Sequence, residues 1–446
     1  MANQNGPPEH FNEINHICCI GARHASVMSM AVIAAAHPQV TVTIVDYDVD
    51  LVQRWEQLDI DFVEPGFQHL VHQVFHANLF FHDQVEDSIN EAQMIFIGVE
   101  IPTKGCGSRL DLVGPRPMGK SDKKYNDSFS GTILTQAQQN AVQFAVFSNL
   151  DFYSPGHAIQ DLTNQDQVLI ARKSDVGNAD VLREMYAAIA QPNRIIVLPN
   201  YVSVELAKVA TNVIVAAKMN YANMVAAVCG KTGANFNHVR QIIGSDYRIN
   251  GNYMDTQLGI GGDEIMKSTL HFRDTLQQNG LRKQAKVVSE MVKLSKRWSK
   301  EFVELVLDGM VSLRNKVIAV FGVTYKSNVA DLKNSRAIEV CKSLLTEGAT
   351  LRIFDPLVNE NAIMGCFTRH VNRVQVVANQ QDAYDQAHAT LCLVDTNIQF
   401  DFQAMQDAMV IPPYLFIACN LNLDNVAVED IRDRGFQLYI HGNQIN

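Results

Sequence analysis

The N-terminal part of the chain alternates between strand-like and helix-like patterns. An apolar run over residues 16–20 leads into a Gly-Ala turn, and a stretch with helical apolar periodicity follows over 27–36. A β-branched run then covers 40–45 and ends in an acidic residue, and a further buried strand is expected at 94–99. Because two parallel strands need a crossover helix between them, this pattern predicts a βαβ unit.

The same alternation returns near the C-terminus. Residues 317–322 form an apolar run with a terminal glycine, 334–347 show helical periodicity, and 350–354 form a second apolar run. This second strand also ends in an acid, Asp355. The fold class predicted is therefore α/β, with two doubly wound domains.

The middle of the chain has a different, helical texture. Residues 202–229 contain no proline or glycine over 28 positions, and 235–243 and 268–309 are also helical in pattern. At 1.5 Å per residue, the first of these helices would span roughly 40 Å. We expect it to form the backbone of a separate helical domain.

These patterns predict three domains. An α/β domain covers 1–200, a helical domain covers 201–312, and a second α/β domain covers 313–446. Within the first domain, residues 105–131 are rich in Gly, Pro, Lys and Ser, so we expect an irregular segment there.

Composition narrows the class of protein. The 446 residues are 47% apolar and 19% charged, which is typical of a globular chain of about three domains. The formal net charge of -10 disfavours a general phosphate-tracking surface, so no nucleic-acid partner is expected. Eight cysteines without a C-x-x-C pair favour reduced thiols and a cytoplasmic location. Residues 1–10 lack an apolar signal core, and no uninterrupted run reaches about eighteen apolar residues, so no membrane segment is predicted.

Short blocks spread along the chain resemble the UDP-glucose dehydrogenases. In chain order they are 17–22, 64–66, 102–104, 205–208 with Asn212, 246–248, 259–262 and 355–356. The resemblance covers almost the whole chain and implies two Rossmann-like domains joined by a central all-helical dimerisation domain. It also implies the family's activity, a double NAD-dependent oxidation of UDP-glucose to UDP-glucuronate through a cysteine-linked thiohemiacetal.

The dinucleotide-binding turn departs from the family pattern. In the fingerprint G-x-G-x-x-G, the second glycine lets the backbone approach the pyrophosphate and the third lets helix and strand pack closely. This chain keeps only Gly21, with Arg23 where pyrophosphate should lie and Ser26 at the packing position. Arg23 could instead pair with a phosphate if it swings clear of the turn, and Asp46 suits a ribose diol. We expect NAD, the cofactor implied by the resemblance, to bind weakly or not at all.

The catalytic loop of the family lacks its nucleophile here. In the family, G-x-G-G is followed by a small residue and then by the cysteine whose thiolate forms the covalent intermediate. Here residues 259–262 are followed by Asp263, and Glu264 takes the cysteine position. A carboxylate cannot form a thiohemiacetal, and no cysteine lies within about thirty residues of Glu264. The family's acidic residue shortly after the lysine is also replaced, by Ser268. If the loop keeps its family position, Glu264 should ion-pair with Lys208 and fill the former active site.

The family's acid–base block, Asn-Pro-Glu-Phe-x-x-Glu-Gly, is altered over 149–156. Its first glutamate is shortened to Asp151, and its second is Pro155. Misplacing a reacting group by about 1 Å can cost roughly a hundredfold in rate. A family threonine from another stretch is matched by Thr132.

Several other site positions do match the family. Lys208 and Asn212, four residues apart and so on one helix face, match the pair that stabilises the oxyanion. Three cations also match family residues. Arg248 matches an arginine that reaches the substrate of a neighbouring subunit, Lys267 matches a lysine that binds the substrate phosphate, and Lys326 matches a lysine of the nucleotide domain. A family arginine near Lys326 is Lys333 here, which cannot offer a bidentate fork. An ordinary ion-paired cation is equally consistent with each of the three.

Three histidines have a spacing that can also hold a metal. His69, His72 and His76 are three and four residues apart and could share one helix face. Spacing alone meets few of the requirements of a metal site, so we interpret them as ordinary helix residues and predict no metal.

Two functions from different classes remain open. The leading hypothesis is a catalytically inactive, UDP-glucose dehydrogenase-like pseudoenzyme with a binding, scaffold or assembly role. The alternative is an NAD-dependent oxidoreductase on UDP-sugars with a cysteine-independent mechanism, in which Asp151, Lys208 or Glu264 is the base. A third reading keeps only UDP-sugar binding in the C-terminal half.

The resemblance also implies self-association. The family pairs through its central helices, and the helix over 202–229 suits such an isologous interface. We expect a homodimer or larger homo-oligomer, and co-assembly with an active paralogue or other protein partners is consistent with a pseudoenzyme.

Overall fold

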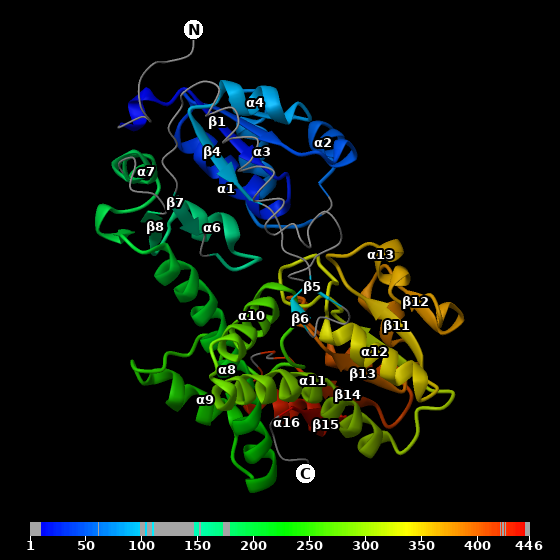
Figure 1. The fold of residues 1–446 in the computed structure, drawn as a ribbon. Coiled ribbons are helices and arrows are strands. Elements are labelled where there is room, and N and C mark those ends of the chain that lie inside the picture. The colour runs from blue at the N-terminus through cyan, green and yellow to red at the C-terminus, as the bar shows by residue number, and fades with distance from the viewer. Residues whose placement is uncertain are drawn as a thin grey trace. The chain divides into compact units, whose positions relative to one another are not determined.

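The computed structural model divides into two compact units, residues 1–209 and 210–446, and each is described by itself. Figure 1 shows the course of the chain. The structure describes residues 10–60, 62–98, 103–104, 109–110, 147–150, 153–172, 179–419, 421, 423 and 425–441. Thr132 and Asp151 lie outside the described residues, so their assigned roles stay predictions.

The first unit contains a parallel four-stranded sheet in the order β3-β2-β1-β4. Its strands are β1 (His16–Ile20), β2 (Thr41–Val45), β3 (Leu79–His82) and β4 (Met94–Ile97). β1 pairs with β2 over its whole length and with β4 on its other side. The predicted βαβ unit is confirmed.

Helices cover this sheet. They are η1 (Phe11–Glu13), α1 (His24–Ala36), α2 (Val49–Glu56), α3 (Phe67–Val74) and α4 (Val85–Glu91). α1 is buried along nearly all of its length because it packs against α3, α6 and the strands β2 and β3. This explains why its sequence is apolar on every face, as expected of a helix inside a core.

A smaller sheet completes the first unit. β7 (Phe147–Leu150) pairs antiparallel with β8 (Val168–Arg172), which pairs parallel with β9 (Ile195–Leu198). The remaining elements are α6 (Ala158–Thr163), α7 (Asp180–Tyr186), η2 (Pro192–Arg194), and the short antiparallel pair β5 (Thr103–Lys104) and β6 (Arg109–Leu110). Apart from residues 109–110, the segment predicted to be irregular lies outside the described residues.

The middle of the chain is helical, as predicted. Its helices are α8 (Tyr201–Thr232), α9 (Phe236–Ser245), α10 (Glu264–Gln278) and α11 (Arg282–Met310). The single helical stretch predicted over 268–309 is wrong in one respect, because the chain breaks at Gly280, whose φ is +76°. The break lets α10 and α11 fold back and pack against each other.

Among the described helices, α8 alone is long and apolar enough to cross a membrane, with a mean hydropathy of 1.3. However, buried polar residues of α8 form hydrogen bonds within the protein. Asn220 accepts a hydrogen bond from the indole Nε1 of Trp298 at 3.1 Å, and the amide of Asn223 donates to the carbonyl of Gln257 at 2.7 Å. Satisfied polar groups of this kind are typical of the protein-facing side of a helix, and 44% of the apolar window is buried.

The C-terminal part is a six-stranded parallel sheet in the order β12-β11-β10-β13-β14-β15. Its strands are β10 (Val317–Phe321), β11 (Thr350–Phe354), β12 (Val374–Val376), β13 (Ala389–Cys392), β14 (Tyr414–Ile417) and β15 (Gln437–Ile440). The helices that connect them are α12 (Arg336–Thr346), α13 (Glu360–Gly365), η3 (Val371–Arg373), α14 (Gln380–Tyr384), α15 (Phe402–Ala408) and α16 (Asn425–Asp433). The direction of strand order reverses between β10 and β13, and ligands of such sheets bind outside the carboxyl ends of the strands at this point. The second predicted doubly wound domain is confirmed.

Candidate functional site

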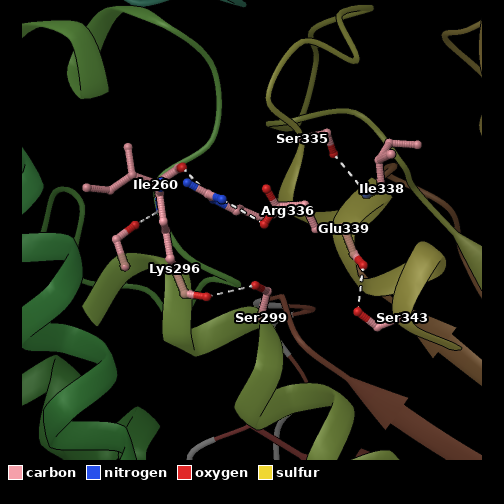
Figure 2. A network of polar contacts seen from close by, with 9 residues as sticks. Ile260, Lys296, Ser299, Ser335, Arg336, Ile338, Glu339 and Ser343 are labelled. Carbon is pink, nitrogen blue, oxygen red and sulfur yellow. Dashed lines mark hydrogen bonds and ion pairs between the residues drawn. The ribbon is translucent and has the colours of Figure 1, made fainter. Parts of the chain in front are cut away.

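The glycine loop 259–262 is held against α11 and α12. The backbone N–H of Ile260 donates to Oγ of Ser295 at 2.8 Å, and its carbonyl accepts from Nε of Arg336 at 2.9 Å. Figure 2 shows Arg336 lying between Ile260 and Glu339, to which its Nη1 donates at 2.7 Å. Both backbone polar groups of Ile260 are thus satisfied, which fixes the loop.

The glycines of this loop are required by close approach. A Cβ at Gly259, where φ is +115°, would lie 2.1 Å from the carbonyl oxygen of Ser295. At Gly261 and Gly262 a Cβ would come within 2.9 Å and 2.8 Å of Tyr325. The loop can therefore lie flat against α11 and Tyr325 only because these positions have no side chain.

The residue after the loop, Asp263, collects two cations. Lys267 Nζ lies 3.0 Å and Lys333 Nζ 2.6 Å from its Oδ2, and the amide of Asn334 donates to its Oδ1. Burial, the largest single influence, raises the pKa of Asp263, but the hydrogen bonds and charges of the two lysines together outweigh it and leave the pKa below its ordinary value. Asp263 is therefore an ionised carboxylate shared by both lysines.

Glu264, which the sequence resemblance assigns to the family's nucleophile position, begins α10. Across from it on α8, the amide Nδ2 of Asn212 donates to Oγ of Ser268 at 2.9 Å and reaches Oε1 of Glu264 at 3.5 Å. The structure thus brings together the matching asparagine and both replaced residues. An amide that the family uses for an oxyanion here contacts side chains of its own chain.

The described cysteines of this unit have raised pKa values. Burial raises the pKa of Cys229, Cys366, Cys392 and Cys419, and it raises that of Cys341 to about 12. A thiol with a raised pKa is a poor nucleophile near neutral pH because little of it is thiolate.

The other matching cations of the second unit have distinct surroundings. Arg248 is 71% exposed and forms a bidentate pair with Asp246, with distances of 2.9 Å from Nε and 2.6 Å from Nη2. Lys326 lies in the turn after β10, where its carbonyl accepts from Oγ1 of Thr324 at 3.0 Å. Lys267 and Lys326 therefore lie on segments that meet the glycine loop, whereas Arg248 projects from the loop after α9.

The dinucleotide-type turn of the first unit keeps its backbone shape. Gly21 has φ +109°, its N–H donates to Val45 at 2.8 Å, and the N–H of Ala22 donates to Oδ2 of Asp46 at 2.9 Å. The indole Nε1 of Trp55 donates to the carbonyl of Ala22 at 2.8 Å. The turn and the strand-end carboxylate are therefore positioned as in a dinucleotide site.

Ser26 lies where α1 comes close to the end of β4. Its Oγ donates to the carbonyl of Gly98 at 3.0 Å, and a Cβ at Gly98 would lie 2.1 Å from that Oγ. Because Gly98 has no side chain, α1 packs closely against the strand end despite Ser26. Arg23 has swung outward, 57% exposed, with Nη2 3.9 Å from Oδ2 of Asp48.

A buried glutamate orders the segment that follows the family's acid–base position. Glu64 is 8% exposed, and its two carboxylate oxygens accept from the N–H groups of Gly156 and Ala158, both at 2.7 Å. These N–H groups precede and begin α6, which makes Glu64 a long-range cap of that helix. The Glu-Pro-Gly block of the sequence therefore has a structural role here.

Two sequence predictions have different outcomes. Lys208 belongs to the first unit and Glu264 to the second, so their ion pair stays a prediction. His69 and His72 lie on α3, but His76 follows its end with φ +55°, beside Glu56 at 4.0 Å. Within the described residues, no three His, Cys, Asp or Glu side chains gather as a metal site would need.

Sequence reasoning missed Asp263 and Arg336. Two adjacent acids shortly before the helical pattern at 268 were a signal for Asp263, because carboxylates are favoured at helix N-termini. Arg336 gave none, since its partner Ile260 lies 76 residues earlier in the chain.

Comparison with known proteins matches this architecture along the chain. Three models of the UDP-glucose/GDP-mannose dehydrogenase family match: the NAD binding domain over 15–114, the central domain over 202–297 and the UDP binding domain over 319–421. UDP-glucose 6-dehydrogenase 4 of Arabidopsis thaliana is 30% identical, with 96% of this chain and 97% of the relative covered. UDP-glucose 6-dehydrogenase 5 of Oryza sativa subsp. japonica is 31% identical with the same coverage.

Solved structures agree on the fold. A UDP-glucose dehydrogenase from Pyrobaculum islandicum superposes with a TM-score of 0.78 at 21% identity, covering 97% of this chain and 98% of the other. A UDP-D-ManNAc dehydrogenase from Pyrococcus horikoshii gives 0.76 at 15% identity, covering 97% and 100%.

Proposed function

The chain belongs to the UDP-glucose/GDP-mannose dehydrogenase family, and we propose that it is a catalytically inactive member with a binding, scaffold or assembly role. The arrangement at the start of α10 carries this proposal. Glu264 stands where the family has its thiolate, and the amide of Asn212 is turned to Ser268 and Glu264. Neither a covalent nucleophile nor an unoccupied oxyanion donor remains at this place in the second unit.

Cofactor binding is proposed to be weak. NAD, when bound, supplies the hydride acceptor, and Gly21, Ala22 and Asp46 are the residues that would hold it. Their positions suit a dinucleotide, and Ser26 does not obstruct it. Arg23 replaces the glycine that lets the backbone approach pyrophosphate, and it is this side chain that would reduce affinity.

A turnover assay tests the proposal. The full-length protein is mixed with NAD and UDP-glucose, and absorbance is followed at the band of reduced nicotinamide. We expect no increase above the rate of a sample without UDP-glucose. Sustained, UDP-glucose-dependent reduction of NAD by the wild-type chain would overturn the proposal.

A matched variant locates the loss. Glu264→Cys combined with Ser268→Asp restores both family residues of the loop. Turnover in this double variant, with none in the wild type, would assign the loss to the loop alone. No turnover in either would mean that changes outside positions 264 and 268, among them Asp263 and Arg23, also prevent the reaction.

A second candidate function has one observation in its favour. The turn between β1 and α1 is ordered by hydrogen bonds to Val45, Asp46 and Trp55 despite its changed sequence. This favours an NAD-dependent oxidoreductase on UDP-sugars that transfers one hydride without a covalent intermediate. Calorimetric titration with NAD separates the two, because tight binding is required by the second function only.

We also propose that the protein is a homodimer. On α8 and α11 of the second unit, several large apolar side chains are exposed, among them Ile214 at 62%, Tyr221 at 52% and Val287 at 64%. They line an apolar groove together with Met291 and Leu294. Exposed apolar patches of this kind support a protein–protein interface, and sedimentation of the full chain tests it.

A further inference from the structure

The second unit contains two lysines and an amide that converge on one carboxylate. We propose that Asp263 is a built-in anion that occupies a cation pair suited to the phosphates of a nucleoside diphosphate, and so keeps this site closed. The inference rests on the proposed function, since a working enzyme of the family must admit a UDP-sugar.

The groups around Asp263 have the chemistry of a phosphate site. Lys267 and Lys333 both contact Oδ2, and Asn334 donates to Oδ1, so both oxygens of the carboxylate are engaged. Phosphate oxygens are bound by the same kinds of group, charged ammonium donors and neutral amide donors. Asp263 and Lys267 are each only 18% exposed, which strengthens the pairing relative to a surface ion pair.

The position in the fold also suits a nucleotide. Lys333 and Asn334 lie in the turn between β10 and α12, outside the carboxyl end of β10. β10 and β13 flank the point where the strand order reverses, which is where open parallel sheets bind their ligands. Asp263 itself is the N-cap of α10, where the helix dipole favours a negative group.

The loop that carries Asp263 prevents it from leaving easily. Ile260 is fixed through its N–H by Ser295 and through its carbonyl by Arg336. Gly261 and Gly262 lie against Tyr325 with no room for a side chain. The backbone before Asp263 is therefore fixed, and an incoming phosphate would have to displace a carboxylate that is part of the chain.

Removing this carboxylate should open the site. Asp263→Ser and Asp263→Asn are prepared in the full chain, and binding of UDP and of inorganic pyrophosphate is measured by calorimetry. We expect Kd for both probes to fall by at least about tenfold, with a gain that diminishes as salt is added. Adding Lys333→Ala to Asp263→Ser should abolish the gain.

The control removes the same charge elsewhere. Glu290→Gln deletes one exposed carboxylate of α11 that pairs with Lys293 at 2.9 Å. It should leave both affinities unchanged. An equal gain in this control would mean that net charge alone is responsible and would overturn the proposal.

The remaining outcomes are equally decisive. If both Asp263 variants keep the wild-type circular dichroism yet bind neither probe more tightly, the inference fails. A gain for UDP without a gain for pyrophosphate would contradict the assignment to phosphate groups. These results do not depend on oxidation, so unchanged binding by a chain that still reduces no NAD would sink this inference and leave the proposed function standing.

Discussion

Substituting alanine for Gly259 tests whether the loop before the replaced nucleophile is held by close contact with α11. The matched control is Gly280→Ala, because both glycines have positive φ, +115° and +76°. A Cβ at Gly280 would meet nothing within 4 Å, whereas at Gly259 it would lie 2.1 Å from the backbone carbonyl oxygen of Ser295. The two variants therefore share backbone strain and differ in steric conflict.

The expected magnitudes follow from this difference. An L-residue in the left-handed region costs about 1–2 kcal/mol, and that is the full effect expected for Gly280→Ala. The conflict at Gly259 involves a backbone atom of a long helix, which cannot move aside as a side chain would. For Gly259→Ala we therefore expect a loss of more than about 4 kcal/mol, in the range of severe packing defects.

The two tryptophans make the measurement selective. Trp55 lies in the first unit and Trp298, buried on α11, in the second. In a Trp55→Phe background, urea unfolding followed by fluorescence reports the second unit alone, which avoids assuming that both units unfold in one step. Equal shifts of the midpoint in the two glycine variants would refute the close-contact reasoning.

Three further predictions concern single side chains. Arg336→Met should destabilise the second unit by about 2 kcal/mol and speed hydrogen exchange in the glycine loop, because it removes the donor to the carbonyl of Ile260. The control is Glu339→Gln, which changes the other partner of Arg336, a side chain that is 51% exposed. This control should change the exchange little. Gly98→Ala should lower the urea midpoint of the first unit in the wild type, because the added Cβ conflicts with the hydroxyl of Ser26. In a Ser26→Gly background the loss should be clearly smaller. Equal losses in both backgrounds would contradict this contact. Burial lowers the pKa of His441 from 6.5 to about 4, so the unfolded chain binds a proton at a higher pH than the folded chain does. The free energy of unfolding should therefore fall as pH drops from about 6.5 to about 4, by at most about 3 kcal/mol. In His441→Gln, the urea midpoint should no longer show this contribution to its pH dependence.

The elements of the fold could be predicted where one periodicity dominates a segment. The apolar run 16–20 and the β-branched run after it were recognisable as strands because both are buried in a parallel sheet. The long helix α8 was recognisable because nothing interrupts it. The break at Gly280 was not, because a glycine in a helical pattern is compatible with either a weak helix position or a helix end.

Long-range contacts explain what the sequence could not show. Ser26 reads as a steric penalty when only its own helix is considered, and its acceptable fit depends on Gly98, 72 residues later. Lys267 matched a position implied by the resemblance and Lys333 replaced a family arginine, yet only the structure shows that Asp263 pairs with both. The sequence therefore showed which residue type stands at each family position, but not which other side chain that residue contacts.

A single-turnover measurement shows whether this chain transfers hydride at all. Protein at a concentration equal to that of NAD is mixed with excess UDP-glucose, so that even one reaction per chain would be seen as reduced nicotinamide absorbance. An active plant UDP-glucose 6-dehydrogenase, treated identically, provides the positive control. We expect no absorbance change for this chain, and one equivalent of reduced nicotinamide per protein chain would show that it is a working dehydrogenase.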